Sequence, residues 1–122
     1  MFKVIIAGSR TFQNYKMLCD YADYKLSRIE DKIEIVSGNA NGADKLGEQY
    51  ARDRGYLLRL FPANWDLYGK RAGYLRNVQM ADYADALLAF WDGKSRGTNN
   101  MIEEAKKRGL KIGIKCFRMD DK

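Results

Sequence analysis

The densest group of small, hydroxyl-bearing and cationic residues lies between Asp92 and Thr98, where the sequence is DGKSRGT. Glycines let a backbone approach a ligand closely, and the free amides at the start of a helix attract anions. Gly93, Ser95, Gly97 and Thr98 are therefore candidates for a phosphate-binding loop, with Asp92 at its start. An ordinary strand-to-helix turn, with Thr98 as the helix N-cap, is the alternative.

Two further polar loops carry the same residue types, each after a short apolar run. The first contains candidates for phosphate binding, Gly8, Ser9 and Arg10. The second, SGNANGAD over residues 37–44, contains candidates for contacts with phosphate or sugar hydroxyls, Ser37, Gly38, Asn41 and Asp44. The alternative for the second loop is a tight turn in which Asp44 is stabilised by the positive end of a helix.

Aromatic and cationic side chains alternate between residues 64 and 76. This mixture can stack on a base and neutralise phosphate, but half-buried loop packing is the predicted role for most of them. The residues concerned are Trp65, Tyr68, Lys70, Arg71 and Tyr74. Arg76 and Asn77, on the helix that follows, are the pair predicted to face a ligand.

Five apolar runs alternate with helical patterns and must position these loops. The runs predicted as strands are 2–7, 33–36, 56–61, 86–91 and 112–117. They predict a single three-layer Rossmann-like α/β domain over residues 1–122, with a five-stranded, mainly parallel sheet covered by helices on both faces. The expected strand order is 3-2-1-4-5. Parallel strands end at one edge, so the three polar loops should meet there, where such sheets bind ligands.

The composition removes several kinds of chemistry. The 122 residues include no histidine, so catalytic triads and imidazole-bound zinc are excluded, and we expect no metal and no cofactor. Cys19 and Cys116 are predicted as two buried free thiols, which indicates a cytoplasmic protein. No run reaches the ~20 apolar residues that cross a bilayer. The net charge of +6 suits a small anion, and less so nucleic acid, because the basic residues are spread along the chain.

The chain resembles the YspA-like branch of the SLOG superfamily, which is named for the DNA-processing protein DprA and the Lonely Guy phosphoribohydrolases. The resemblance is carried by AGSRTF (7–12), by SGNANGAD (37–44) and by the long stretch from Phe61 to Ala105. It implies a nucleotide-derived ligand, such as a nucleoside monophosphate or ADP-ribose, and a homo-oligomer, either dimer or tetramer.

Lonely Guy enzymes release the base from nucleoside 5′-monophosphates, and their motif pairs an Arg-Lys with a later Gly-Gly-x-Gly-Thr-x-x-Glu. Arg76-Asn77 and Gly97-Thr98 fall at corresponding positions, but Met101 falls at the glutamate. Methionine cannot assist a glycosidic cleavage. The resemblance therefore favours ligand binding; N-glycosidic hydrolysis, with Arg76, Asp44 or Asp92 as catalytic candidates, and nucleic-acid binding of the DprA kind are the alternatives.

Overall fold

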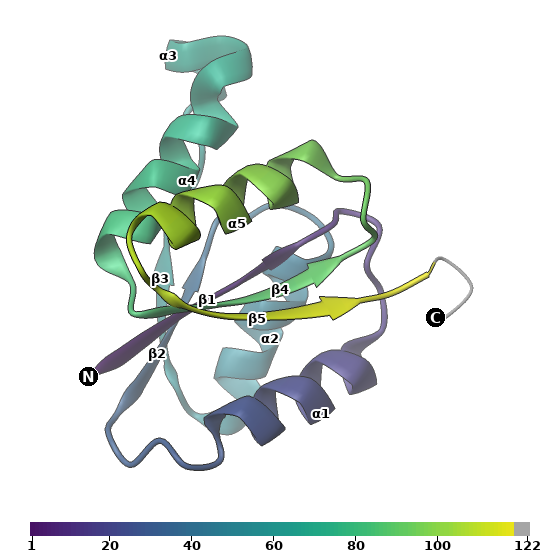
Figure 1. Ribbon diagram of the computed structural model, residues 1–122, viewed down its shortest axis with the longest axis vertical. Helices are drawn as coiled ribbons and strands as arrows, with labels where there is room; N and C mark the ends of the chain where they lie inside the picture. The colour runs from purple at the N-terminus through teal and green to yellow at the C-terminus, as the bar shows by residue number, and fades with distance from the viewer. Residues whose placement is uncertain (119–122) are drawn as a thin grey trace.

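Five parallel strands form a single sheet at the centre of the molecule, in a computed structural model that describes residues 1–118 (Figure 1). The strands are β1 (Phe2–Gly8), β2 (Ile33–Ser37), β3 (Leu57–Leu60), β4 (Ala86–Trp91) and β5 (Lys111–Cys116). Their order across the sheet is β3-β2-β1-β4-β5, and every neighbouring pair is parallel. The predicted α/β class, Rossmann-like architecture and strand order are confirmed.

Helices cover both faces of the sheet (Figure 1). They are α1 (Tyr15–Leu26), α2 (Ala43–Arg54), α3 (Trp65–Tyr68), α4 (Ala72–Tyr83) and α5 (Arg96–Lys107). Side chains alternate across β1, as they must in a strand: Val4 and Ile6 pack in the cluster under α1 and α2, whereas Ile5 packs with α4 and α5. Because both faces are covered, these three residues are fully buried.

Local signals explain where most helices begin and end. Asn14 caps α1 by accepting a hydrogen bond from Met17 N, and Gly55 ends α2 in the left-handed conformation. The alternative in which Thr98 is the N-cap is wrong, because α5 begins at Arg96 and Ser95 Oγ accepts the hydrogen bond from Thr98 N. Thr98 is thus the third residue of the helix.

A short projecting segment between β3 and α4 was not predicted. Helix α3 and the 3-10 turn Gly69–Arg71 together contain no buried residue, and Figure 1 shows α3 standing away from the body. One turn of helix is too short for a hydrophobic period, although Asn64 caps it by accepting from Leu67 N.

Two smaller predictions have mixed outcomes. Both cysteines are free thiols, but neither is buried as predicted: Cys19 is half-buried, and Cys116 is exposed at the end of the edge strand β5. No helix in residues 1–118 has the length and hydrophobicity required to traverse a bilayer.

Candidate functional site

The three polar loops meet at the carboxyl edge of the sheet. A Cβ on Gly42 would lie 2.4 Å from the carbonyl oxygen of Ser9, so the loops after β1 and β2 are in backbone contact. Ser9 Oγ accepts a hydrogen bond of 3.1 Å from the amide of Asp92, which joins the loop after β4 to the same group. The topology thus brings together segments that are far apart in the sequence.

A cleft with two lobes opens beside these loops. The inner lobe, about 200 Å³, is walled by Gly8, Asp44, Met80, Gly97, Thr98 and Met101 among others. The outer lobe, about 330 Å³, is walled by Gly38, Asn39, Asn41, Pro62 and Ala63. Four residues line both lobes, namely Arg10, Ala40, Trp65 and Arg76. The two lobes therefore adjoin, and both arginines lie at the junction between them.

Arg76 is held firmly at this junction. Its Nη1 donates to the carbonyl oxygen of Gly38, and its Nε donates to Asn77 Oδ1 at 3.1 Å. A side chain on Gly38 would collide with the guanidinium, because the Cβ would lie 2.4 Å from Arg76 Nη1. A glycine is therefore required at position 38 because Arg76 occupies the space that a side chain would need. This requirement does not depend on a ligand that approaches the backbone closely.

Asp44 is a nearly buried carboxyl group, 5% exposed, in the wall of the inner lobe. Burial raises its pKa to about 6, although the Ala40 amide and the charges of Arg76 and Arg10 oppose the shift. The Ala40 amide donates to Asp44 Oδ2 at 3.1 Å. Raised pKa values in a cleft are typical of functional carboxyl groups, and near neutral pH this group can accept hydrogen bonds from sugar hydroxyls.

The cleft carries more positive charge than its one carboxyl group can balance. Burial lowers the pKa of Arg76, Asp44 opposes this shift, and repulsion from Arg10 adds to it. Arg10 is exposed and lies over the Trp65 ring at 5.9 Å, and it makes no ion pair within residues 1–118. A bound anion would relieve the repulsion between the two cations.

The loop after β4 contributes fewer free amides than the sequence suggests. Asp92 Oδ1 accepts hydrogen bonds from the amides of Lys94 and Ser95, both at 2.8 Å. Burial would raise the pKa of Asp92, but these bonds, with one from Ser9, lower it overall. Two amides expected to be open to a phosphate are thus used within the loop. The amide of Gly97 has no such partner among the described residues, Gly97 lines the inner lobe, and a Cβ added to it would meet no atom within 4 Å.

Four of the predicted site residues do not line either lobe: Ser9, Ser37, Asp92 and Gly93. Ser37 is fully buried, where its hydroxyl donates to Glu48 at 2.7 Å and accepts from the Asn39 amide. The other candidates line the cleft, namely Gly8, Arg10, Gly38, Asp44, Arg76, Asn77, Ser95, Gly97 and Thr98. Their contacts with a ligand remain predictions.

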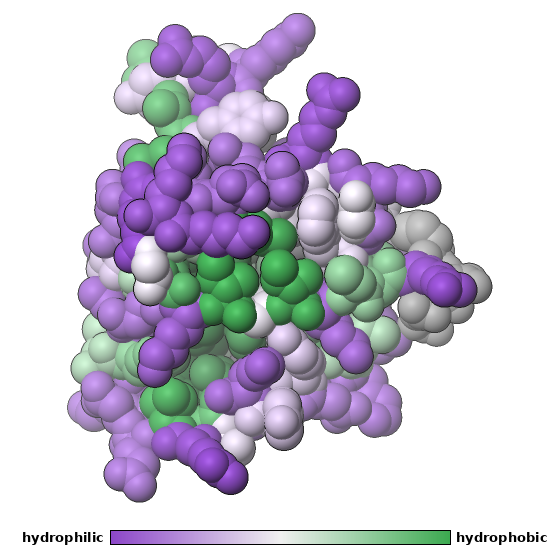
Figure 2. Space-filling model, viewed as in Figure 1, coloured by the Kyte–Doolittle hydropathy of each residue, from purple (hydrophilic) through white to green (hydrophobic). Residues whose placement is uncertain are grey.

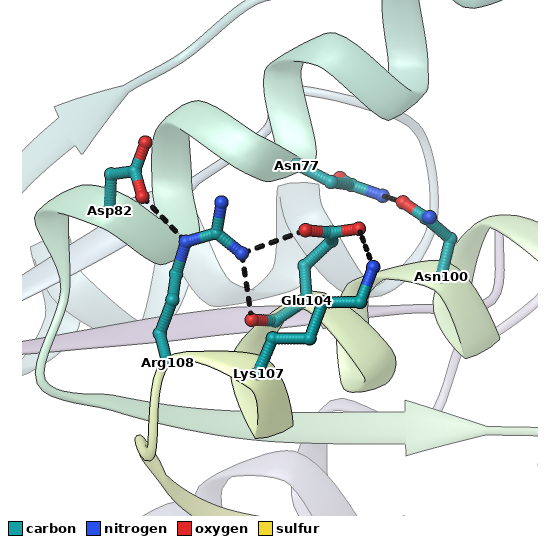
Figure 3. A network of polar contacts seen from close by, with 6 residues as sticks. All are labelled: Asn77, Asp82, Asn100, Glu104, Lys107 and Arg108. Carbon is teal, nitrogen blue, oxygen red and sulfur yellow. Dashed lines mark hydrogen bonds and ion pairs between the residues drawn. The ribbon is translucent and has the colours of Figure 1, made fainter.

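A polar network fixes α4 against α5 and so fixes the two sides of the inner lobe (Figure 3). Asn77 Nδ2 donates to Asn100 Oδ1 at 2.9 Å and to the carbonyl oxygen of Gly97 at 3.2 Å. Further along, Arg108 joins Asp82 of α4 to Glu104 of α5, with N–O distances of 2.5 and 2.7 Å. The side-chain NH2 group of Asn77 is thus used in hydrogen bonds to α5. The role of Asn77 is therefore to hold the two sides of the inner lobe in place.

The floor of the inner lobe is apolar. Met80 and Met101 are each 1% exposed and both line it. Met101, which the resemblance sets at the glutamate of the Lonely Guy motif, therefore lines the cleft without providing a carboxylate. Asp44 is the one acidic residue among the described residues that line either lobe.

Sequence reasoning underestimated the aromatic wall. Trp65, Tyr68 and Tyr74 are 50%, 48% and 46% exposed, so about half of each side chain is open to solvent, as expected for half-buried residues. Trp65 and Tyr74, with Lys70, line the inner lobe. The spacing of aromatics and cations was visible in the sequence, but it did not indicate that the segment projects from the body.

Comparisons with known proteins agree with this architecture. The sequence pattern of one family, described as the YspA, cpYpsA-related SLOG family, matches residues 2–68. The Gene 61 protein of Mycobacterium phage D29 is 36% identical over 118 residues, which cover 92% of this chain and 94% of that protein. No solved structure matches the chain significantly.

Proposed function

Because the chain belongs to the YspA, cpYpsA-related SLOG family, we propose that it binds a nucleotide-derived small molecule, such as a nucleoside monophosphate or ADP-ribose, in the two-lobed cleft. The observation that carries this proposal is the convergence of Arg10 and Arg76 on one cleft in which Asp44 is the single carboxyl group among the described lining residues. Two cations beside a polar and partly apolar cavity suit a phosphate attached to an organic group.

The contacts divide by chemistry. Arg10, Arg76 and the Gly97 amide would bind phosphate oxygens, helped by the positive end of α5. Asp44 would accept hydrogen bonds from sugar hydroxyls. Ser9 and Asp92, which lie behind the cleft, would hold the loops together and would not touch the ligand.

Isothermal titration with AMP and ADP-ribose tests the proposal. Arg10→Ala should weaken binding by roughly tenfold or more, the value of one charge-assisted contact. Arg71→Ala is the matched control, because Arg71 is an exposed cation of the neighbouring segment that lines neither lobe. No heat with either nucleotide, or equal losses in the two variants, would refute the proposal.

N-glycosidic hydrolysis is a second candidate, which the raised pKa of Asp44 favours. A protonated carboxyl group in a cleft can act as a general acid on a leaving base. Met101 argues against it, since no second carboxylate lines the described cleft. Chromatography of a panel of nucleoside monophosphates after incubation with the protein tests this candidate. Release of free base by the wild type and not by Asp44→Asn would support hydrolysis. If no substrate of the panel releases its base, hydrolysis is excluded.

Single-stranded nucleic acid is a further candidate ligand, since Trp65, Tyr68 and Tyr74 are exposed beside Lys70 and Arg71. Exposed aromatics stack on bases, and cations bind the backbone. Binding of this kind should weaken steeply as salt increases. Absence of a gel shift at low ionic strength would exclude it.

A homo-oligomer, either dimer or tetramer, is also part of the proposal. Apolar residues are exposed on both edge strands, with Leu57 and Leu60 on β3 and Ile114 on β5. Figure 2 shows apolar side chains gathered over the β5 region, between hydrophilic surroundings. Sedimentation at several concentrations measures the state directly, and a monomer throughout would contradict the expectation.

A further inference from the structure

The open edge of the sheet at β5 is separate from the cleft, because no residue of this strand lines either lobe. We propose that two copies of the chain associate through this edge, with their β5 strands paired antiparallel about Ile114 so that one sheet continues from copy to copy. This inference rests on the homo-oligomer proposed above and says which surface forms it. It does not depend on the ligand of the cleft.

Every second residue of β5 turns its backbone N–H and C=O groups away from β4. The amide of Lys111 donates to the Asp85 carbonyl at 3.3 Å, and the amide of Phe117 donates to the Trp91 carbonyl at 3.0 Å, so the odd-numbered residues bond to β4. Backbone groups alternate in direction along a strand, so the even-numbered residues face outward. These are Ile112, Ile114 and Cys116. Since β5 is the last strand of the sheet in residues 1–118, this row is a template for another strand.

The side chains of the same three residues share one face of the sheet. Ile112 packs against the core cluster on the α4 and α5 side, Ile114 is 40% exposed, and Cys116 is exposed. Figure 2 shows the apolar side chains gathered there. The exposed leucines of the other edge strand, Leu57 and Leu60, lie on opposite faces of a strand of four residues. Only β5 therefore combines an outward backbone with an apolar strip on one face, among the strands described.

The β5 edge is complementary to its own image under a two-fold axis. With the axis at Ile114, this residue lies opposite Ile114 of the second copy, and Ile112 lies opposite Cys116. All three outward-facing residues then exchange backbone hydrogen bonds with the other strand. A contact in which one patch pairs with itself is the isologous kind that closes a dimer, which is why the occupant we name is a second copy of this chain.

The two lysines of β5 select this register. Lysines on an edge strand commonly oppose pairing, and like charges directly opposite each other are destabilising. With the axis at Ile114, Lys115 lies opposite Gly113 and Lys111 lies opposite Phe117, so no lysine faces another. Moving the axis to Gly113 would set Lys111 directly opposite Lys115. The charges thus permit the pairing about Ile114 and disfavour its neighbour.

A shallow groove beside β5 can enlarge the contact. Its volume is about 430 Å³, and Met17, Tyr21 and Tyr24 of α1 wall it together with Lys115. Tyr24 is 73% exposed. A few paired strand residues bury less than the ~1,200–2,000 Å² of a stable interface. A two-fold axis perpendicular to the sheet keeps each face on its own side, so it brings α1 of one copy toward α1 of the other and adds these side chains to the interface.

Sedimentation at several protein concentrations tests the surface. Ile114→Lys sets a cation opposite its own copy, so it should weaken the self-association of the wild type by about 100-fold or more. Leu60→Lys is the matched control, because Leu60 is 44% exposed on the opposite edge strand, and it should leave the association constant within about twofold. Both side chains are exposed, so both variants should melt cooperatively.

Disulfide trapping tests the register. In a hydrogen-bonded antiparallel pair the Cα atoms are ~5.5 Å apart, within the ~4.4–6.8 Å that a disulfide spans. Ile112→Cys should therefore form a covalent dimer with the native Cys116 of the second copy after mild oxidation, seen on a non-reducing gel. The double variant Ile112→Cys, Cys116→Ser should form none. Lys111→Cys is the control, because its side chain lies on the other face of β5.

The outcomes separate this inference from the proposals above. A wild type that is monomeric throughout would overturn both the oligomer and the β5 interface. An oligomer that survives in Ile114→Lys, or that Leu60→Lys disrupts equally, would overturn the β5 interface alone. So would an oligomer in which Ile112→Cys yields no covalent dimer, or no more than Lys111→Cys. Nucleotide titration of the cleft is a separate measurement, which none of these results decides.

Discussion

The buried carboxyl group of Asp44 predicts how stability should change with pH. Its pKa in the folded protein is raised from 3.8 to about 6 by burial, so between these values the folded chain retains a proton that the unfolded chain releases. The free energy of unfolding must then decrease as pH rises through this window, and it becomes independent of this group above both values. Each pKa unit is worth ~1.4 kcal/mol, so the loss from about pH 4.5 to about pH 7 is about 2 kcal/mol.

Asp44→Asn isolates this contribution. Asparagine keeps the shape and an acceptor for the Ala40 amide but does not titrate, so all other groups are shared by the two proteins. Urea unfolding between about pH 4.5 and pH 7 should show the variant gaining about 2 kcal/mol relative to the wild type. A parallel Asp66→Asn series should follow the wild type, because Asp66 is exposed on α3. If the wild-type and Asp44→Asn curves stay parallel across the range, Asp44 has an ordinary pKa and the reasoning from burial is wrong.

Three other substitutions test the packing that positions the cleft. Gly38→Ala should displace the guanidinium of Arg76, because the new Cβ would lie 2.4 Å from its Nη1, and nucleotide binding measured by titration should be lost while the fold melts cooperatively. Ser95→Ala removes the N-cap of α5 and should cost about 1 kcal/mol in chemical unfolding, whereas Ser95→Asp should retain most of it. Gly47→Ala should cost roughly 1–3 kcal/mol in the same assay, because its Cβ would lie 2.7 Å from the buried Ile6 side chain; an unchanged midpoint would show that the core can relax.

The sheet was predictable because its signals are long and redundant. Continuous apolar runs such as Val4–Ile6 are required by a parallel sheet covered on both faces, and the strand order follows from short right-handed connections. The meeting of the three polar loops follows from the same topology. Helix ends can be located from sequence where one residue type determines them, as the asparagine cap at Asn14 and the glycine at Gly55 do.

The details of the cleft were less predictable because they depend on competition between partners. Asp92 could have left the amides of its loop free, but its own carboxylate takes two of them. Gly38 was expected to let a phosphate approach its backbone, whereas in the structure the guanidinium of Arg76 occupies that space. The exposed wall formed by Trp65 and Tyr74 depends on a one-turn helix, which leaves no periodic pattern in a sequence.

The distribution of polar contacts favours binding over turnover in this cleft. Asp44 already accepts from the Ala40 amide and faces Arg76, so it serves the arrangement of the loops as well as any ligand. A glycosidase needs a carboxylate free to stabilise an oxocarbenium-like state. Met101, which the resemblance sets at the glutamate of the Lonely Guy motif, is packed into an apolar floor. Placing a charge there would cost its full desolvation. The cations at the junction, by contrast, lack sufficient anionic partners, and a phosphate would supply them.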